Sequence, residues 1–144
     1  MSNMTMKDIA EAMRDIDFAM LNTLTDDGKI AGRPMSNNRD VAFDGDSYFF
    51  TYENTRTVED IKRSADVNLS LQGSKGLLGK PPLFLSVEGR AELIRDRAVL
   101  EKHWNSDLEY WFEQGLDTPG IVLIKVHATR IHYWNGNEDG ELLV

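Results

Sequence analysis

The feature that most constrains the fold is a succession of short apolar segments separated by turn signals. The segment beginning at Phe18 runs into Asp26-Asp27-Gly28, a sequence typical of a hairpin turn, and Ile30 to Ser36 follows as its antiparallel partner. The same reasoning predicts strands at 67–72 and 84–94, a second hairpin at 41–52 that turns at 44–46, and two closing strands at 120–128 and 130–135. The sequence therefore predicts about seven strands.

Three helices are expected between these strands. Thr5 is a suitable N-cap, with Asp8 three residues later, for a helix over 5–15. A second helix begins near Thr55 or Thr57, and a third follows the cap Asp96 and continues to Phe112. Consecutive antiparallel strands favour a small barrel with peripheral helices, and the absence of a strand–helix alternation disfavours a doubly wound parallel sheet.

Composition excludes several classes of function. The 144 residues fit a single domain over 1–144, and they include no cysteine, which excludes disulfides and thiolate sites. A net charge of −8 argues against nucleic acid and anionic membrane as partners. Charged residues near the N-terminus stand where a signal peptide would be apolar, so the protein is expected in the cytoplasm.

Most sequence signatures of catalysis are missing. No serine has a nucleophile-elbow context, and no acidic or cysteine pattern accompanies His127 and His132, which flank the turn predicted between the last two strands. We therefore expect no metal site. The segment "GSKGLLGKPP" (73–82) has the wrong spacing for a P-loop, and Pro81 stands where a serine or threonine is needed. We interpret it as a loop.

Two polar segments remain as candidates for ligand binding. Arg33 and Pro34 lie in a predicted strand, where proline is tolerated only at an edge or where the backbone faces something other than a strand. Thr55-Arg56-Thr57 opens a helix, whose free N–H groups, together with two hydroxyls and an arginine, could cradle a phosphate. Arg33 could complete such a cradle. Alternatively, the threonines only cap the helix and Arg56 is solvated.

In their order along the chain, several segments resemble the FMN-binding split barrels of the pyridoxamine 5′-phosphate oxidase-like superfamily, and most closely its general stress protein branch. They are "FAMLNTLTDDGKIAGRPM", "YFFTYENTRTVEDIKRSADVNLSL", "FLSVEGRAELIRDRAVLEKHWN", "YWFEQG" and "IVLIKVHATRIHYWNG". The resemblance implies a mainly β fold: an antiparallel split barrel of six to seven strands with peripheral helices, which forms a homodimer and binds FMN at the subunit interface.

The resemblance also assigns roles to individual residues. By position, the implied FMN-binding residues are Arg33, Pro34, Met35, Phe50, Thr51, Thr55, Arg56, Thr57 and Trp134. One departure concerns the phosphate: the family usually has lysine where this chain has Thr57, so Arg56, or Lys75 or Lys80 from the loop, would have to supply the charge. Another is that the arginine- and histidine-containing C-terminal motif of true pyridoxamine phosphate oxidases is missing, which argues against that reaction.

Three functions remain open at this point. The first is an FMN-dependent oxidoreductase with a role in stress, which takes hydride from a reduced nicotinamide and passes electrons to an unidentified small molecule. No acid–base residue for such a reaction can be named. The second is a flavin-binding carrier or sensor without turnover. The third is a split barrel that has lost FMN and binds another ligand, such as a deazaflavin or haem.

Overall fold

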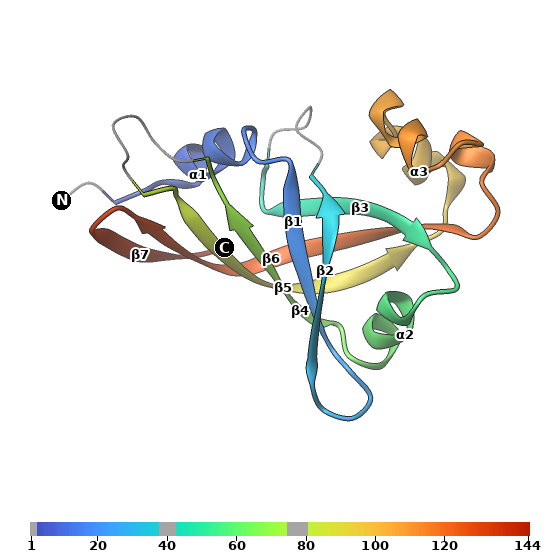
Figure 1. The fold of residues 1–144 in the computed structure, drawn as a ribbon, viewed down its shortest axis with the longest axis horizontal. Helices are drawn as coiled ribbons and strands as arrows, with labels where there is room; N and C mark the ends of the chain where they lie inside the picture. The colour runs from blue at the N-terminus through green and yellow to red at the C-terminus, as the bar shows by residue number, and fades with distance from the viewer. Residues whose placement is uncertain (1–2, 38–42, 75–80) are drawn as a thin grey trace.

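The centre of the molecule is one antiparallel sheet (Figure 1). The computed structural model describes residues 3–37, 43–74 and 81–144. Its strands are β1 (Phe18–Leu24), β2 (Ile30–Ser36), β3 (Asp46–Tyr52), β4 (Asp66–Gln72), β5 (Phe84–Ile94), β6 (Ile121–Asn135) and β7 (Glu138–Leu143). Within these ranges, six of the seven strands follow the order β2-β1-β4-β5-β6-β3, and the seventh, β7, lies off this path and pairs with β6. The strands β2 and β3 therefore form the two ends of the path, as expected for a split barrel.

Helices lie around this sheet. They are α1 (Met6–Met13), α2 (Arg56–Arg63) and α3 (Arg97–His103), with short 3-10 helices η2 (Ser106–Tyr110) and η3 (Gly115–Asp117). Thr5 and Asp8 form the predicted capping box of α1. In the part of the chain that the structure describes, no helix is long and apolar enough to cross a membrane.

The helix predicted from Asp96 to Phe112 is wrong in its second half. Asp96 caps α3 as expected, but the helix ends at His103 because Trp104 adopts an extended conformation with ψ of 142°. Asn105 then accepts a hydrogen bond from the Asp107 N–H and starts the separate turn η2. The chain therefore changes direction after α3, and Leu108 and Phe112 join the same apolar cluster as Leu100 of α3.

Apolar side chains gather in two clusters. The larger one lies between the sheet and α1, where Ile9 and Met13 pack against inward-facing residues of the strands such as Leu21. The smaller one comprises Phe50, Leu100, Phe112 and Leu123, with Trp104 and Leu108 packed against it. This second cluster holds α3 and η2 against β3 and β6.

The C-terminal half of the sheet differs from the prediction. The two closing strands are one continuous strand, β6, so His127 and His132 do not flank a turn. Its register with β5 shifts at Glu88/Gly89. Up to His127, β6 pairs with β3, and from Arg130 onward it pairs with β7, which the sequence analysis missed. The same edge of β6 thus pairs with β3 along its first part and with β7 along its last part.

The hairpin predicted at 41–52 is also wrong. Its returning arm is β3, but β3 pairs with β6 through contacts such as Asp46 with His127. Phe43 is outside any strand, and 41–42 lie outside the described residues. The paired residues lie between 69 (Tyr52 with Ile121) and 81 (Asp46 with His127) positions apart, so the pairing leaves no local signal. Asp44-Gly45, in contrast, looks like an ordinary hairpin turn.

Replacing Gly89 with alanine is expected to destabilise the fold. At the register shift, a methyl group on Gly89 would come 2.6 Å from the carbonyl oxygen of His127. Because this neighbour is backbone, the strands would have to move apart, at a cost of about 1–3 kcal/mol. Urea unfolding measures the loss. Gly73→Ala is the control, since its methyl would meet its nearest atom at 3.5 Å, and an equal loss in both variants would contradict this reason.

Candidate functional site

Pro34 lies on an edge of the sheet. Among the described residues β2 pairs only with β1, and Pro34 stands opposite Met20. The other side of β2 faces no strand, so a proline that cannot donate an N–H is tolerated there. One of the two explanations offered by the sequence, an edge strand, is therefore confirmed.

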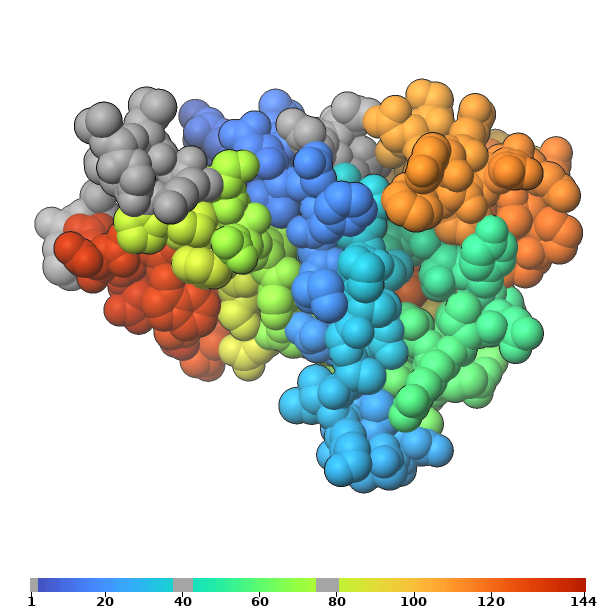
Figure 2. All heavy atoms as spheres, viewed as in Figure 1, coloured from blue at the N-terminus to red at the C-terminus, as the bar shows by residue number. Residues whose placement is uncertain are grey.

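A cavity of about 270 Å³ lies between the edge strands β2 and β3. We call it the split cavity. It is lined by Phe18, Pro34, Met35, Ser36, Phe49, Phe50, Thr51, Tyr52, Leu108, Trp111 and Phe112. The structure thus brings together four residues predicted to bind a cofactor: Pro34, Met35, Phe50 and Thr51. The segment after α3 closes one side, and this segment (orange) meets β2 (cyan) on the face shown in Figure 2.

Aromatic rings give the split cavity firm walls. Phe50 packs edge-on against Trp104 with ring centres 5.1 Å apart, and Phe112 lies 5.1 Å from the ring of Tyr52. The hydroxyl of Tyr52 donates to the carbonyl oxygen of Trp111 over 3.4 Å. Such a mainly apolar space between aromatic walls suits a flat aromatic ring system. The sequence analysis did not name Phe18, Trp111 and Phe112 as residues of this site. They are separated in sequence from β2 and β3, and only the fold brings them to the same cavity.

The split cavity lies close in the chain to the start of α2, since β3 ends at Tyr52. Thr55 caps the helix: its hydroxyl accepts from the Val58 N–H over 3.3 Å and donates to the Tyr52 carbonyl over 3.0 Å. The first N–H groups of a helix have no partner inside it and carry partial positive charge. Arg56 is exposed, and within the described ranges its side chain has no hydrogen bond or ion pair. Thr57 is buried.

Arg33 makes contacts within the protein that the sequence analysis did not predict. Its guanidinium turns toward α2, with Nη2 lying 3.6 Å from Oδ2 of Asp60. Its Nη1 donates to the hydroxyl of Thr23 over 2.5 Å and to the carbonyl of Ala31 over 3.2 Å. Asp60 stands one helical turn after Arg56, so Arg33 lies along the side of α2, near its start. Arg33 therefore has a structural partner in addition to any ligand.

Asp60 anchors this arrangement and was missed by the sequence analysis. Only 2% of its surface is exposed. Burial raises the pKa of its carboxyl group, but hydrogen bonds from Thr23 and Arg63 and the charges of Arg63 and Arg33 outweigh burial and hold that pKa below its ordinary value. The sequence did contain a signal for this role: Asp60 falls on the same face of α2 as the apolar residues Val58 and Ile61, and an acidic residue on a buried face needs a partner.

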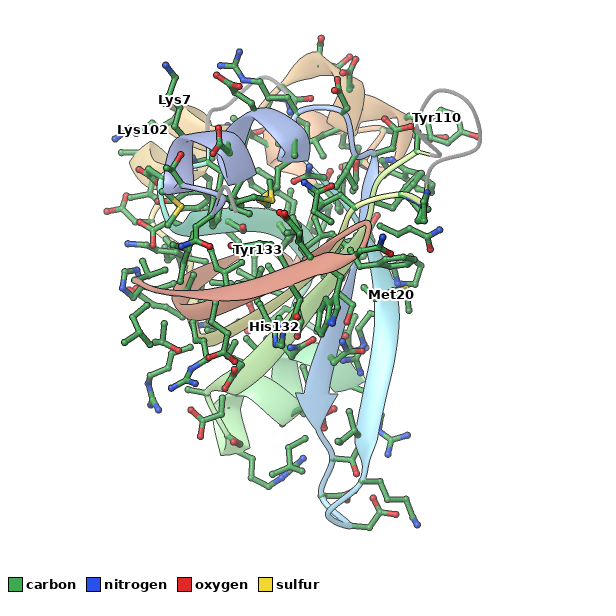
Figure 3. The ribbon with its side chains drawn as sticks, turned by 90° about the vertical axis from the view of Figure 1, so that its left-hand side faces the viewer. Lys7, Met20, Lys102, Tyr110, His132 and Tyr133 are labelled. Atoms are coloured by element: carbon green, nitrogen blue, oxygen red, sulfur yellow. The ribbon has the colours of Figure 1, made fainter. Side chains whose placement is uncertain are left out.

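Trp134 does not join the other candidates within one chain. It lies on the outer face of the sheet, stacked on His132 with ring centres 3.9 Å apart, and lines a separate hollow of about 400 Å³ with Met20 and Phe84 (Met20 and His132 are labelled in Figure 3). Phe18 borders both this hollow and the split cavity. Lys75 and Lys80 lie outside the described residues. Among residues 3–37, 43–74 and 81–144, no three side chains that could ligate a metal come together.

Comparison with known proteins accounts for this architecture. The sequence profile of the family described as "Pyridoxamine 5′-phosphate oxidase like" matches residues 4–144. The chain belongs to this family. It is 27% identical over 137 residues to General stress protein 26 of Bacillus subtilis, with 94% of each protein covered. The predicted superfamily and its general stress branch are therefore confirmed.

Two solved structures show how widely the fold is shared. A Clostridium acetobutylicum protein related to general stress protein 26 superposes with a TM-score of 0.79 at 20% identity, covering 96% of this chain and 94% of that one. A haem-binding protein from Mycobacterium smegmatis gives a TM-score of 0.74 at 12% identity, covering 99% of this chain and 60% of that one. At these identities the likeness concerns the fold alone, and it confirms the predicted split barrel.

Proposed function

We propose that the split cavity binds FMN and that the protein is an FMN-dependent oxidoreductase acting on a small molecule. The observation that carries this proposal is the meeting of Pro34, Met35, Phe50 and Thr51 around one apolar cavity, beside the start of α2. At that start, Arg56 has no hydrogen bond or ion pair with any residue that the structure describes. FMN has two parts that need different surroundings, a flat ring system and a charged phosphate group. The chain offers both, in neighbouring places.

The residues fit the cofactor in the following way. The backbone of β2 at Pro34 and that of β3 at Thr51 would border the flavin ring. The N–H groups at the start of α2 and the side chain of Arg56 would hold the phosphate, with charge support from Arg33. Arg33 and Arg63 together outnumber the single carboxylate of Asp60, so the side of α2 keeps positive charge for an anion. Arg56 thus supplies the charge that the usual lysine would supply at the position of Thr57.

Once bound, flavin supplies hydride and single-electron chemistry, and the protein's part is to bind, orient and shield the ring. A reduced nicotinamide is the proposed donor of hydride. Relatives named as general stress proteins support a role under stress. Because the chain lacks the C-terminal arginine- and histidine-containing motif, we do not propose pyridoxamine phosphate as its substrate.

We further propose that two copies of the chain share the cofactor sites. Phe18, Met20, Phe84 and Trp134 are large apolar side chains with at least 40% of their surface exposed on one face of the sheet. Phe18 connects this face to the split cavity, so a second copy packed here would bring its own Trp134 toward the flavin. Sedimentation analysis of the protein and of Trp134→Glu tests this proposal: a dimer that the variant weakens supports it, and a monomeric parent protein contradicts it.

Titration with FMN and, separately, with haem tests the choice of cofactor. We expect saturable binding of FMN at micromolar concentration, about −8 kcal/mol, with a change in the visible spectrum of the flavin. Binding of haem but not of FMN would contradict the proposal. Steady-state oxidation of a reduced nicotinamide by the FMN-loaded protein then distinguishes an oxidoreductase from a carrier or sensor, which would bind FMN without turnover.

A further inference from the structure

A hollow of about 270 Å³ adjoins the split cavity, and we call it the Tyr110 hollow. It is lined by Tyr52, Tyr110, Trp111, Glu113, Gln114 and Thr118. Tyr52 and Trp111 also line the split cavity, so the two spaces share these residues as a common wall. The hydroxyl of Tyr52 meets the carbonyl oxygen of Trp111 there over 3.4 Å. A ligand too long for the split cavity therefore has the Tyr110 hollow next to it.

Two large aromatic side chains of the Tyr110 hollow are exposed. Tyr110 has 82% of its surface exposed and Trp111 has 53%, whereas the next residue, Phe112, is buried in the smaller apolar cluster. The rings of Tyr110 and Trp111 lie 5.0 Å apart and almost at right angles, at 83°. This edge-on contact makes a corner in which a flat ring can stack on one ring and meet the other. Adjacent exposed rings of this kind are typical of binding surfaces.

Polar groups stand around this aromatic corner. The carboxylate of Glu113 and the amide of Gln114 are exposed, and neither has a side-chain partner in the part of the chain that the structure describes. The hydroxyl of Thr118 donates to the carbonyl oxygen of Gly115 over 2.6 Å, so its oxygen can still accept. These groups offer hydrogen-bond acceptors together with an amide donor. A nucleobase such as adenine, which stacks by its faces and has N–H donors and acceptor nitrogens at its edge, matches them.

The Tyr110 hollow is also close to the proposed phosphate site. The start of α2 lies three residues after Tyr52, and the hydroxyl of Thr55 donates to the carbonyl oxygen of Tyr52 over 3.0 Å. The split cavity, the start of α2 with Arg56, and the Tyr110 hollow therefore meet at Tyr52. A molecule that joins two flat rings through phosphates, which is a dinucleotide, has one part for each of these places.

We propose that the Tyr110 hollow binds the adenosine end of a dinucleotide whose other ring reaches the split cavity. The placement of that other ring rests on the proposed function, whereas the nucleobase follows from the lining of the hollow itself. Two dinucleotides have this chemistry. One is FAD, whose flavin ring would take the place of that of FMN, and the other is reduced nicotinamide adenine dinucleotide (NADH), whose nicotinamide would meet bound flavin.

Titration of ADP into the full chain without flavin tests the nucleobase site. NMR follows the indole N–H signal of Trp111, assigned by its loss in Trp111→Phe. We expect ADP to shift this signal saturably at millimolar concentration, because a base stacked in the corner changes the magnetic surroundings of the indole. Pyrophosphate, which has the charge but no ring, should shift it much less. No shift by ADP, or an equal shift by pyrophosphate, would overturn the proposal.

A matched pair of variants tests the role of the exposed tyrosine. Tyr110→Ala should weaken ADP binding at least about fivefold, as expected when one stacking ring is removed. Glu109→Ala changes the preceding residue, which is also exposed but lies outside the lining, so ADP binding should stay near that of the parent protein. Equal effects of the two variants would contradict the proposal. So would ADP that fails to bind while Tyr110→Ala dissociates a dimer, because the rings would then belong to an interface between two copies.

Two further comparisons distinguish FAD from NADH. FAD binding at least about fivefold more tightly than FMN, with the difference lost in Tyr110→Ala, assigns the hollow to the flavin cofactor. A KM for NADH at least about fivefold below that for reduced nicotinamide mononucleotide, measured on the FMN-loaded protein and again equalised in Tyr110→Ala, assigns it to the hydride donor. The absence of both differences would overturn the proposal. Since ADP binding is measured without flavin and FMN binding separately, failure of either proposal leaves the other identifiable.

Discussion

Asp60→Asn is expected to lower the free energy of unfolding by about 3 kcal/mol at neutral pH, as when one partner of a buried ion pair is removed. The carboxylate of Asp60 receives hydrogen bonds from Thr23 over 2.8 Å and from Arg63 over 2.9 Å, with Arg33 close by. Asparagine fills the space but leaves both arginines without their counter-charge. The side chains of Arg33 and Arg63 are 20% and 42% exposed, so water compensates in part and the cost stays at the lower end of the range.

The same variant should change how stability depends on pH. The pKa of Asp60 is lower in the folded protein than in the unfolded chain, so the unfolded chain takes up the proton first as the solution is acidified. The stability due to the carboxylate is complete above the unfolded pKa of about 3.9 and is lost as pH falls through the lower folded value. The difference between parent protein and variant should therefore be largest at neutral pH and shrink below about pH 4.

Urea unfolding at neutral pH and at several acidic pH values measures both effects. Asp66→Asn is the control, because Asp66 also pairs with an arginine, Arg90, over 2.8 Å, but its side chain is 77% exposed. This variant should change stability little at any pH. If Asp60→Asn were as mild as Asp66→Asn, the buried pair would not hold α2 to the sheet.

Arg56→Glu is expected to weaken FMN binding at least about 100-fold, which corresponds to about 2.7 kcal/mol. One charge-assisted hydrogen bond to a phosphate contributes about 1.5–3 kcal/mol, and reversing the charge adds repulsion to its loss. Arg56 suits this test better than Arg33, because its exposed side chain has no partner in the part of the chain described by the structure. Its replacement should leave the fold intact, whereas Arg33 also supports Asp60.

Riboflavin, which lacks the phosphate, provides the decisive comparison. Arg56→Glu should leave riboflavin affinity nearly unchanged while FMN affinity falls, as fluorescence titration of both flavins would show. Lys62→Glu is the matched variant, since Lys62 is an exposed cation on the same helix but in its last turn, paired with Glu59. It should alter FMN binding much less. Equal losses for both flavins, or for both variants, would place the phosphate elsewhere.

Local parts of the fold could be predicted from the sequence, and distant pairings could not. The hairpin of β1 and β2, the capping box at Thr5 and the whole of β5 agree with the predictions, because turn, cap and alternation signals lie within a few residues. The pairing of β3 with β6 joins segments far apart in sequence, and β6 continues through its register shift where the sequence suggested two strands.

In the candidate site, too, some residues could be predicted from the sequence and others could not. Pro34 and Thr51 could be named because family resemblance assigns positions one by one, and the structure brings them to one cavity. Their role in binding a cofactor stays a prediction. The attachment of Arg33 to Asp60 could not be foreseen, since it depends on how α2 packs against β1 and β2. Trp111 and Phe112 were placed in a continuing helix, so their turn toward the split cavity was missed.

A crystal structure of the protein soaked with FMN tests the central claim most directly. The account predicts the flavin ring between Pro34 on β2 and Thr51 on β3, with the phosphate at the start of α2 and within hydrogen-bond reach of Arg56. Flavin bound away from the split cavity, or a phosphate that contacts neither α2 nor Arg56, would contradict it.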